Sequence, residues 1–345
     1  MKQRNYSLDL LRVVLCICVI AQHSLPHFGL VSPLAREAFP TFLIAADGLF
    51  YMLSGYFNLN KEFNNSSDIL KYYKNKIIYV LLPFLGFTFF WTIWDYLHEV
   101  GSFELLGILK AFYISVMDTS ASGHLWFLYP LFGLLLSAPF LSKMLHSMSD
   151  SELKILWRIA IGFNVICYFF CYDMGVGFKF MGWLLEGWAL YFFAGYYYRR
   201  IASKEPKIKW IIICILGYVL TILGKMDKLP ILLYFAGSVD YQPLFTLFCL
   251  GYLFCFDNFI KITNDIIQKI ILFLSKNTYM IYMFHSQGIA YVVRKLNIVD
   301  SSVLNGLIVV FTAFIASLLV SFIANSLMKP IQKLIDKYWI IKEGE

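Results

Sequence analysis

Ten segments of the chain are each long and apolar enough to cross a lipid bilayer, and this constrains the fold more than any other feature. A membrane-spanning helix needs about 20 mostly apolar residues, because the hydrocarbon core cannot satisfy an open polar backbone. Only 15% of the 345 residues are charged, against about 25% in a typical soluble domain. The sequence therefore predicts an all-α polytopic membrane protein with about ten transmembrane helices. The segments run roughly over 8–27, 39–58, 77–98, 124–145, 155–172, 180–198, 208–224, 241–256, 277–294 and 303–327.

The positions of the basic residues predict how the spans are oriented. Ten spans place both termini on one side of the membrane, and the connections then alternate between the two sides. Of the 29 Lys and Arg residues, 22 fall on the side of the termini and 7 on the other. Because cytoplasmic loops carry an excess of Lys and Arg, this split predicts cytoplasmic termini in a multi-pass protein of the cell (inner or plasma) membrane. The same distribution argues against nucleic-acid binding, despite a net charge of +7.

The chain is predicted to form a single integral membrane domain over residues 1–345, with no appended soluble domain. The connections are short apart from an outer one at 99–123, in which the interrupted apolar stretch 103–117 predicts an interfacial or re-entrant helix. The seven cysteines fall in or at the ends of apolar runs and form no C-x-x-C pattern. We therefore expect small packing residues, with no disulfide framework and no metal.

The first span carries two residues that are expensive to bury in hydrocarbon, Arg12 and His23. At about 100° per residue their spacing exceeds three full turns by about 20°, so both side chains lie on one helix face, about 16 Å apart along the axis. Asp9, one turn before Arg12, is placed to pair with it. The alternative is that Arg12 extends to the interface and His23 only packs.

Two further stretches place small or polar groups near span ends. In "FYMLSGYF" the pair Ser54 and Gly55 permits close helix approach, and packing alone is a strong alternative. In "GHLWFL" His124 and Trp126 fall at the outer mouth of the fourth span. A Trp at that depth is common in an aromatic belt, whereas a histidine beside it is able to bind a polar substrate.

Two other ionisable residues lie within later spans. His285 falls at roughly mid-depth in the ninth span, and Glu186 is a carboxylate within the sixth. A carboxylate at that depth needs a partner or a water-filled cavity, so structural pairing and catalysis are both open for Glu186.

In this order and on this hydropathy, the stretches resemble the membrane-bound acyltransferase 3 family over most of the chain. The family's opening helix has a Leu-Asp-x-x-Arg start and an Arg-x10-His spacing, present here from Leu8 to His23. Its Phe-Phe-x-x-Ser-Gly pattern corresponds to "FYMLSG", in which Tyr51 is a conservative departure. "HLWFL", "FFAGYYYRR" and "YMIYMFH" are similar to its later landmarks, and the last of these contains His285.

The resemblance implies an enzyme that transfers an acyl group, usually acetyl, from cytoplasmic acyl-CoA to a hydroxyl of a cell-surface polysaccharide or its lipid-linked precursor. Acetyl-CoA is then the expected donor, without a metal. The expected partners are membrane lipid, acyl-CoA and a glycan acceptor, with no nucleic acid. The sequence leaves a homo-oligomer open.

The expected catalytic residues are His23 and Arg12. A neutral imidazole suits removal of the acceptor's hydroxyl proton near pH 7, and a guanidinium offers a fork of donors to phosphate or carbonyl oxygens of the donor. Direct transfer is favoured over acylation of His23, because no second nucleophile stands out, but both stay open. The other assigned residues are Ser54 on the donor side and His124, Trp126, Glu186 and His285 on the substrate side.

Two other functional classes stay open: a glycan or lipid transporter, and a structural component of an envelope-polymer assembly complex. A transporter is expected to carry internal repeats or paired broken helices, and none is visible in the sequence. Consumption of acetyl-CoA by membranes that contain the protein, in the presence of a glycan acceptor, separates the enzyme from both.

Overall fold

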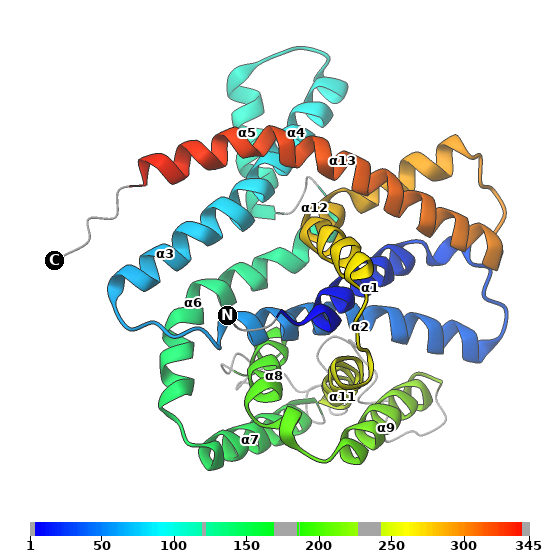
Figure 1. The fold of residues 1–345 in the computed structure, drawn as a ribbon. Helices are drawn as coiled ribbons and strands as arrows, with labels where there is room; N and C mark the ends of the chain where they lie inside the picture. The colour runs from blue at the N-terminus through cyan, green and yellow to red at the C-terminus, as the bar shows by residue number, and fades with distance from the viewer. Residues whose placement is uncertain (1–3, 119–121, 169–184, 186, 227–242, 340–345) are drawn as a thin grey trace.

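The computed structural model of the protein describes residues 4–118, 122–168, 185, 187–226 and 243–339 (Figure 1). Within these ranges the secondary structure is helical and no strand occurs, which confirms the predicted all-α class for this part of the chain. The main helices are α1 (Tyr6–His23), α2 (Pro33–Asn58), α3 (Ser66–Lys76), α4 (Leu82–Val100), α5 (Leu105–Asp118), α6 (Leu128–Ser147), α7 (Asp150–Tyr168), α8 (Trp188–Arg200), α9 (Lys207–Lys225), α11 (Pro243–Phe259), α12 (Asp265–Lys295) and α13 (Val303–Tyr338).

Within the described ranges, six helical segments are long and apolar enough to cross a membrane, as expected of a membrane protein. They are Tyr6–His23, Pro33–Asn58, Ser66–Val100, Gly123–Ser147, Lys207–Lys225 and Val303–Tyr338. Helices α7, α8, α11 and α12 occupy the other predicted positions, and three of those predicted spans extend outside the described residues. The number of ten spans and the orientation of the termini stay predictions.

Helix α1 lies among the other helices, packed against α2 on one side and α12 on another, while α13 packs along α12 and α9 along α11 (Figure 1). The tightest crossing joins α2 to α8. A Cβ added to Gly55 would lie 1.7 Å from the carbonyl oxygen of Phe192, and one added to Gly195 would lie 1.8 Å from that of Met52. Only glycine allows two backbones to approach this closely, so the predicted close helix approach at Gly55 is confirmed.

Hydrogen bonds between distant segments place the two ends of α1 at opposite ends of the bundle. Asn5 Nδ2 donates to Asp257 Oδ1 at 2.6 Å, which brings the start of α1 to the end of α11. At the other end the amide of Ser302 donates to the carbonyl of His27 at 3.1 Å, which brings the segment after α1 to the connection between α12 and α13. In each case the two segments that meet are ones that the predicted topology places on the same side of the membrane.

Several helix boundaries differ from the predicted spans. The predicted connection 59–76 contains α3, which begins at a capping box between Asn65 and Asp68 and is joined to α4 by a π-helical turn, Ile77–Leu81. Helix α13 continues past 327 to Tyr338, through Pro330. Hydropathy marks the part of a helix that suits hydrocarbon, whereas the helix itself continues as long as its backbone bonds and caps are satisfied. The predicted helix at 103–117 is present as α5, packed against α4.

Candidate active site

Three histidines from distant parts of the chain converge on one point. The ring of His285 lies 5.0 Å from the ring of His23 and 4.6 Å from that of His124, measured between ring centroids. His23 is the last residue of α1, His124 lies in the short 3-10 helix Gly123–Phe127 (η3), and His285 lies in α12. We call these three residues the histidine cluster.

His23 is the open member of the cluster. The helix ends directly after it, at Ser24, and the chain turns into the 3-10 helix Leu25–His27 (η1). The side chain is exposed, and neither ring nitrogen has a hydrogen-bond partner among the described residues. Both nitrogens are therefore available to a substrate, which a packing histidine would not offer.

His124 is buried and fixed by its hydrogen bonds. Its Nε2 lies 3.1 Å from the carbonyl oxygen of Met283, and its Nδ1 lies 2.7 Å from Ser122 Oγ. Because a carbonyl can only accept, Nε2 carries the hydrogen and Nδ1 accepts from the serine hydroxyl. Gln287 Nε2 donates in turn to Ser122 Oγ at 3.3 Å. The chain Gln287–Ser122–His124 thus holds one neutral tautomer of the imidazole.

His285 is fully buried and presents a free lone pair. Its Nδ1 donates to the carbonyl oxygen of Tyr282 at 2.5 Å, so the hydrogen sits on Nδ1 and Nε2 is an acceptor. Within the described part of the chain that Nε2 is buried without a hydrogen-bond partner. Tyr282 itself donates its hydroxyl to the carbonyl of His124, which ties α12 to η3. A buried acceptor without a protein partner is able to accept a hydrogen bond from a bound substrate or water.

Arg12 lies at the other end of α1 and is partly engaged by the protein. Its Nη1 donates to Asp9 Oδ1 at 2.9 Å, as the sequence predicted, and its guanidinium carbon lies 4.3 Å from the centre of the Phe57 ring. Asp9 also accepts from Arg4 at 2.6 Å and from Ser275 Oγ at 3.1 Å. The Nε and Nη2 groups of Arg12 have no acceptor among the described residues, so one edge of the fork stays open.

The remaining predicted site residues are not all gathered at the cluster. Trp126 is 38% exposed and its ring lies 5.5 Å from that of Trp188, whereas His124, two residues earlier, faces His285. Ser54 lies next to the crossing of α2 and α8, half-buried. Glu186 lies outside the described residues, so its assignment to the substrate side stays a prediction.

Four residues near the cluster were not singled out from the sequence. Ser122, Tyr282 and Gln287 act through contacts that no local pattern indicates. Asp47 is different: it is a half-buried carboxylate on α2 that lies within electrostatic range of Tyr282. Its position inside the span 39–58 is itself a signal, because an ionisable residue within a span marks a candidate site.

The chemistry that these groups offer is acid–base and hydrogen-bonding chemistry. Within the described ranges, no group of three or more His, Cys, Asp and Glu side chains is arranged to hold a metal ion. The cluster combines one exposed imidazole with two buried neutral ones, inside a helical membrane bundle. The fold and the cluster are those of a helical membrane protein with polar groups gathered inside its bundle.

The chain belongs to the acyltransferase 3 family. The family model, described as an acyltransferase domain, matches residues 5–326, which include all three segments that carry the histidine cluster. The curated proteins give no significant match, and the solved structures give none either. Family membership establishes acyl transfer as the general class of reaction.

Proposed function

We propose that the protein transfers an acetyl group from cytoplasmic acetyl-CoA to a hydroxyl of a cell-envelope glycan or its lipid-linked precursor. The observation that carries the proposal is the exposed His23, with both ring nitrogens free of described partners, against the buried His285 in a chain of the acyltransferase 3 family. A hydroxyl is a poor nucleophile until a base removes its proton, and an imidazole with a free nitrogen is suited to that task.

In the proposed reaction His23 takes the proton of the acceptor hydroxyl while the oxygen attacks the thioester carbonyl carbon. A carbon–oxygen bond forms, the carbon–sulfur bond breaks, and the proton returns from His23 to the leaving thiolate of CoA. The products are an acetyl ester and free CoA. The step needs no second nucleophile, in keeping with direct transfer.

The two buried histidines are proposed to position the reacting groups. The lone pair on His285 Nε2 is oriented by the bond from Nδ1 to Tyr282, and its ring packs on His23. It is suited to accept a hydrogen from His23 or from the acceptor. His124 has both nitrogens engaged, so it contributes shape and a fixed dipole rather than a proton.

Arg12 is proposed to bind the donor from the other end of α1. Its open Nε and Nη2 edge matches two oxygens of a phosphate or a carbonyl. The helix between Arg12 and His23 is uninterrupted, which keeps them about 16 Å apart along the axis. A pantetheine arm spans a distance of that order. Ser54 stays assigned to the donor side on the family pattern.

The proposal is tested with the full-length protein in lipid nanodiscs, supplied with acetyl-CoA labelled in the acetyl group and with surface glycan extracted from the host. Label is expected in the glycan as a base-labile ester, and proton NMR of host polysaccharide is expected to lose O-acetyl signals when the gene is removed. If the glycan stays unlabelled and no acetyl-CoA is consumed, acyl transfer to that glycan is contradicted. The protein would then be a glycan or lipid transporter or a structural component of an assembly complex.

A further inference from the structure

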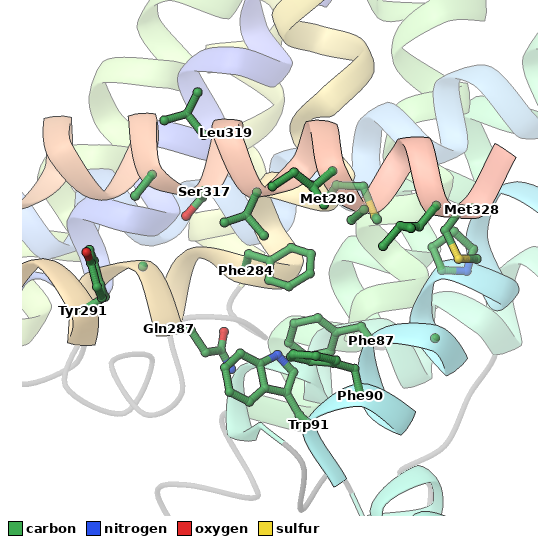
Figure 2. Close-up of a pocket in the computed structure, with 18 residues that line it drawn as sticks. Phe87, Phe90, Trp91, Met280, Phe284, Gln287, Tyr291, Ser317, Leu319 and Met328 are labelled. Atoms are coloured by element: carbon green, nitrogen blue, oxygen red, sulfur yellow. The ribbon is translucent and has the colours of Figure 1, made fainter. Parts of the chain in front are cut away.

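A cavity of about 630 Å³ lies between α4, α12 and α13 (Figure 2). The three histidines of the cluster are not among the residues that line it. Its walls are almost wholly apolar, with aromatic rings on α4 and α12 and aliphatic side chains on α13. Gly86, Gly288 and Ala324, which have little or no side chain, are among the residues on its walls. The residues that line it carry no charge, within the part of the chain that the structure describes.

The cavity opens onto the side of the bundle rather than onto one of its ends. On α13 the lining residues Leu319, Ile323 and Leu327 are between 60% and 69% exposed, and Phe90 on α4 is 54% exposed. Exposed apolar side chains on a spanning helix face the hydrocarbon of the bilayer. The occupant of such a cavity therefore enters from the membrane and is itself largely hydrocarbon.

The two ends of the cavity differ in polarity. At one end Gly86 faces Met328, where an added Cβ would lie 3.4 Å from its sulfur. At the other end Gly288 faces Ser317, whose Oγ would lie 2.6 Å from an added Cβ. Ser317 Oγ is buried and has no partner in the described ranges, and the same holds for Oε1 of the neighbouring Gln287. One end is thus purely apolar, while the other holds unpaired polar atoms.

A third unpaired group and a direct connection to the histidines mark the polar end. Trp91 Nε1, on the cavity wall, is also buried without a described partner. Gln287, seen with Trp91 in Figure 2, is the first residue of the chain Gln287–Ser122–His124. The ring of Phe87, in the same wall, lies 6.3 Å from the ring of His124. The polar end of the cavity therefore borders the histidine cluster.

We infer that this cavity holds the hydrocarbon chain of a membrane-anchored acceptor, whose hydroxylated head group lies at the Gln287 end and reaches the histidine cluster. The inference rests on the proposed function and names its acceptor as an amphiphile rather than a free polysaccharide. Unpaired acceptor and donor atoms at one end suit the hydroxyls of a sugar head group. A chain carried by the CoA donor fits less well, because its phosphates would require cations that the cavity walls lack.

The test measures chain binding directly, without turnover. The full-length protein in nanodiscs is irradiated with a hexadecyl glucoside that carries a diazirine at mid-chain, and labelled peptides are located by mass spectrometry. We expect labelling concentrated on the cavity walls of α4, α12 and α13. Excess unlabelled hexadecyl glucoside is expected to reduce it at least fivefold, whereas methyl glucoside, palmitoyl-CoA and phospholipid leave it unchanged.

Two variants fill the cavity from opposite walls, and one matched variant does not. Ala324→Phe and Gly86→Leu are each expected to reduce labelling about fivefold or more, with size-exclusion elution unchanged. Ser326→Phe, an exposed position of α13 outside the cavity, is expected to label as the parent protein does. Having the second cavity-filling variant keeps the test decisive if Ala324→Phe fails to fold.

Three outcomes would overturn the inference. Labelling spread evenly over the exposed apolar surface and indifferent to both cavity-filling variants would mean ordinary surrounding lipid. Stronger competition by palmitoyl-CoA than by hexadecyl glucoside would assign the cavity to the donor. If phospholipid reduced the labelling as much as hexadecyl glucoside does, the cavity would not recognise a hydroxylated head group. His23→Ala separates this inference from the proposed function, because it is expected to lose acetyl transfer and to keep the labelling.

Discussion

The two ends of α1 differ in how far the protein itself satisfies their polar side chains. At the Arg12 end a buried carboxylate, Asp9, accepts hydrogen bonds from Arg4, Arg12 and Ser275. The Nε and Nη2 groups of Arg12 have no acceptor among the described residues. At the His23 end the imidazole has no described partner, and the lone pair of His285 beside it is also free. The first arrangement is that of a rigid binding group, whereas the second presents ring nitrogens that are free to bind a substrate.

Asp9 therefore stabilises the fold, whereas the His23 side chain is positioned by the fold and contributes no hydrogen bond to its described part. Removal of Asp9 would leave two arginines without their shared carboxylate, whereas removal of His23 breaks no hydrogen bond within the described chain. A residue whose loss costs little stability but much activity is the mark of a reacting group.

The largest expected effect is that the two ends of α1 lie on opposite sides of the membrane, so that a reagent outside the cell reaches one end and not the other. In a cysteine-free background, Val299→Cys lies in the connection between α12 and α13, at the His23 end, and Asn64→Cys lies in the connection after α2. A membrane-impermeant maleimide applied to intact cells is expected to label position 299 and not position 64, because the basic residues predict the latter side to be cytoplasmic. Labelling of position 64 from outside would reverse the predicted topology.

Next in size is the loss of the open imidazole. His23→Ala is expected to lower kcat for acetyl transfer by about 100- to 10,000-fold, the usual contribution of a general base. Thermal unfolding in detergent should stay near that of the parent protein, because the exposed ring makes no described hydrogen bond. A folded His23→Ala protein that transfers acetyl groups at a near-normal rate would remove His23 from the mechanism and make it a packing residue.

A smaller effect is expected at the closed end. Arg12→Lys keeps the charge and the pairing with Asp9 but loses the fork, so donor KM should rise about ten- to a hundredfold, the value of one charge-assisted hydrogen bond. Steady-state kinetics with acetyl-CoA varied at fixed acceptor measure this. If Arg12 only extends to the interface, lysine serves equally well and donor KM is unchanged.

The smallest expected effect concerns the buried partner of the cluster. His124→Ala removes neutral hydrogen bonds next to the acceptor, so acceptor KM is expected to rise about three- to tenfold with donor KM nearly constant. His124→Asn, which keeps a polar side chain at that position, should recover part of the loss. Equal changes in both KM values would show that His124 supports the whole bundle rather than the acceptor side.

The sequence by itself determined the class of the protein and the features that depend on near neighbours along one helix. Hydropathy gave the positions of the spanning helices, because a segment must match the bilayer whatever its neighbours are. The pairing of Asp9 with Arg12 followed from their spacing of one turn, and the close contact at Gly55 followed from its missing side chain. Family membership was also predictable, since the motif order is a property of the chain.

Tertiary structure alone decided which residues meet. The sequence placed His124 beside a tryptophan at the outer mouth of one span and His285 at mid-depth in another. Only the packing of α12 against α1, with η3 alongside, brings both to His23. The same packing sets the tautomer of His124, because the Met283 carbonyl that accepts from its Nε2 comes from α12. The tautomer of His285 is instead set within α12 itself, by the carbonyl of Tyr282 three residues earlier. The cavity likewise is lined by residues from three helices that meet only in the folded bundle. Helical periodicity reports only the face of one helix, and the choice of partner for that face is made by the packing of the whole bundle.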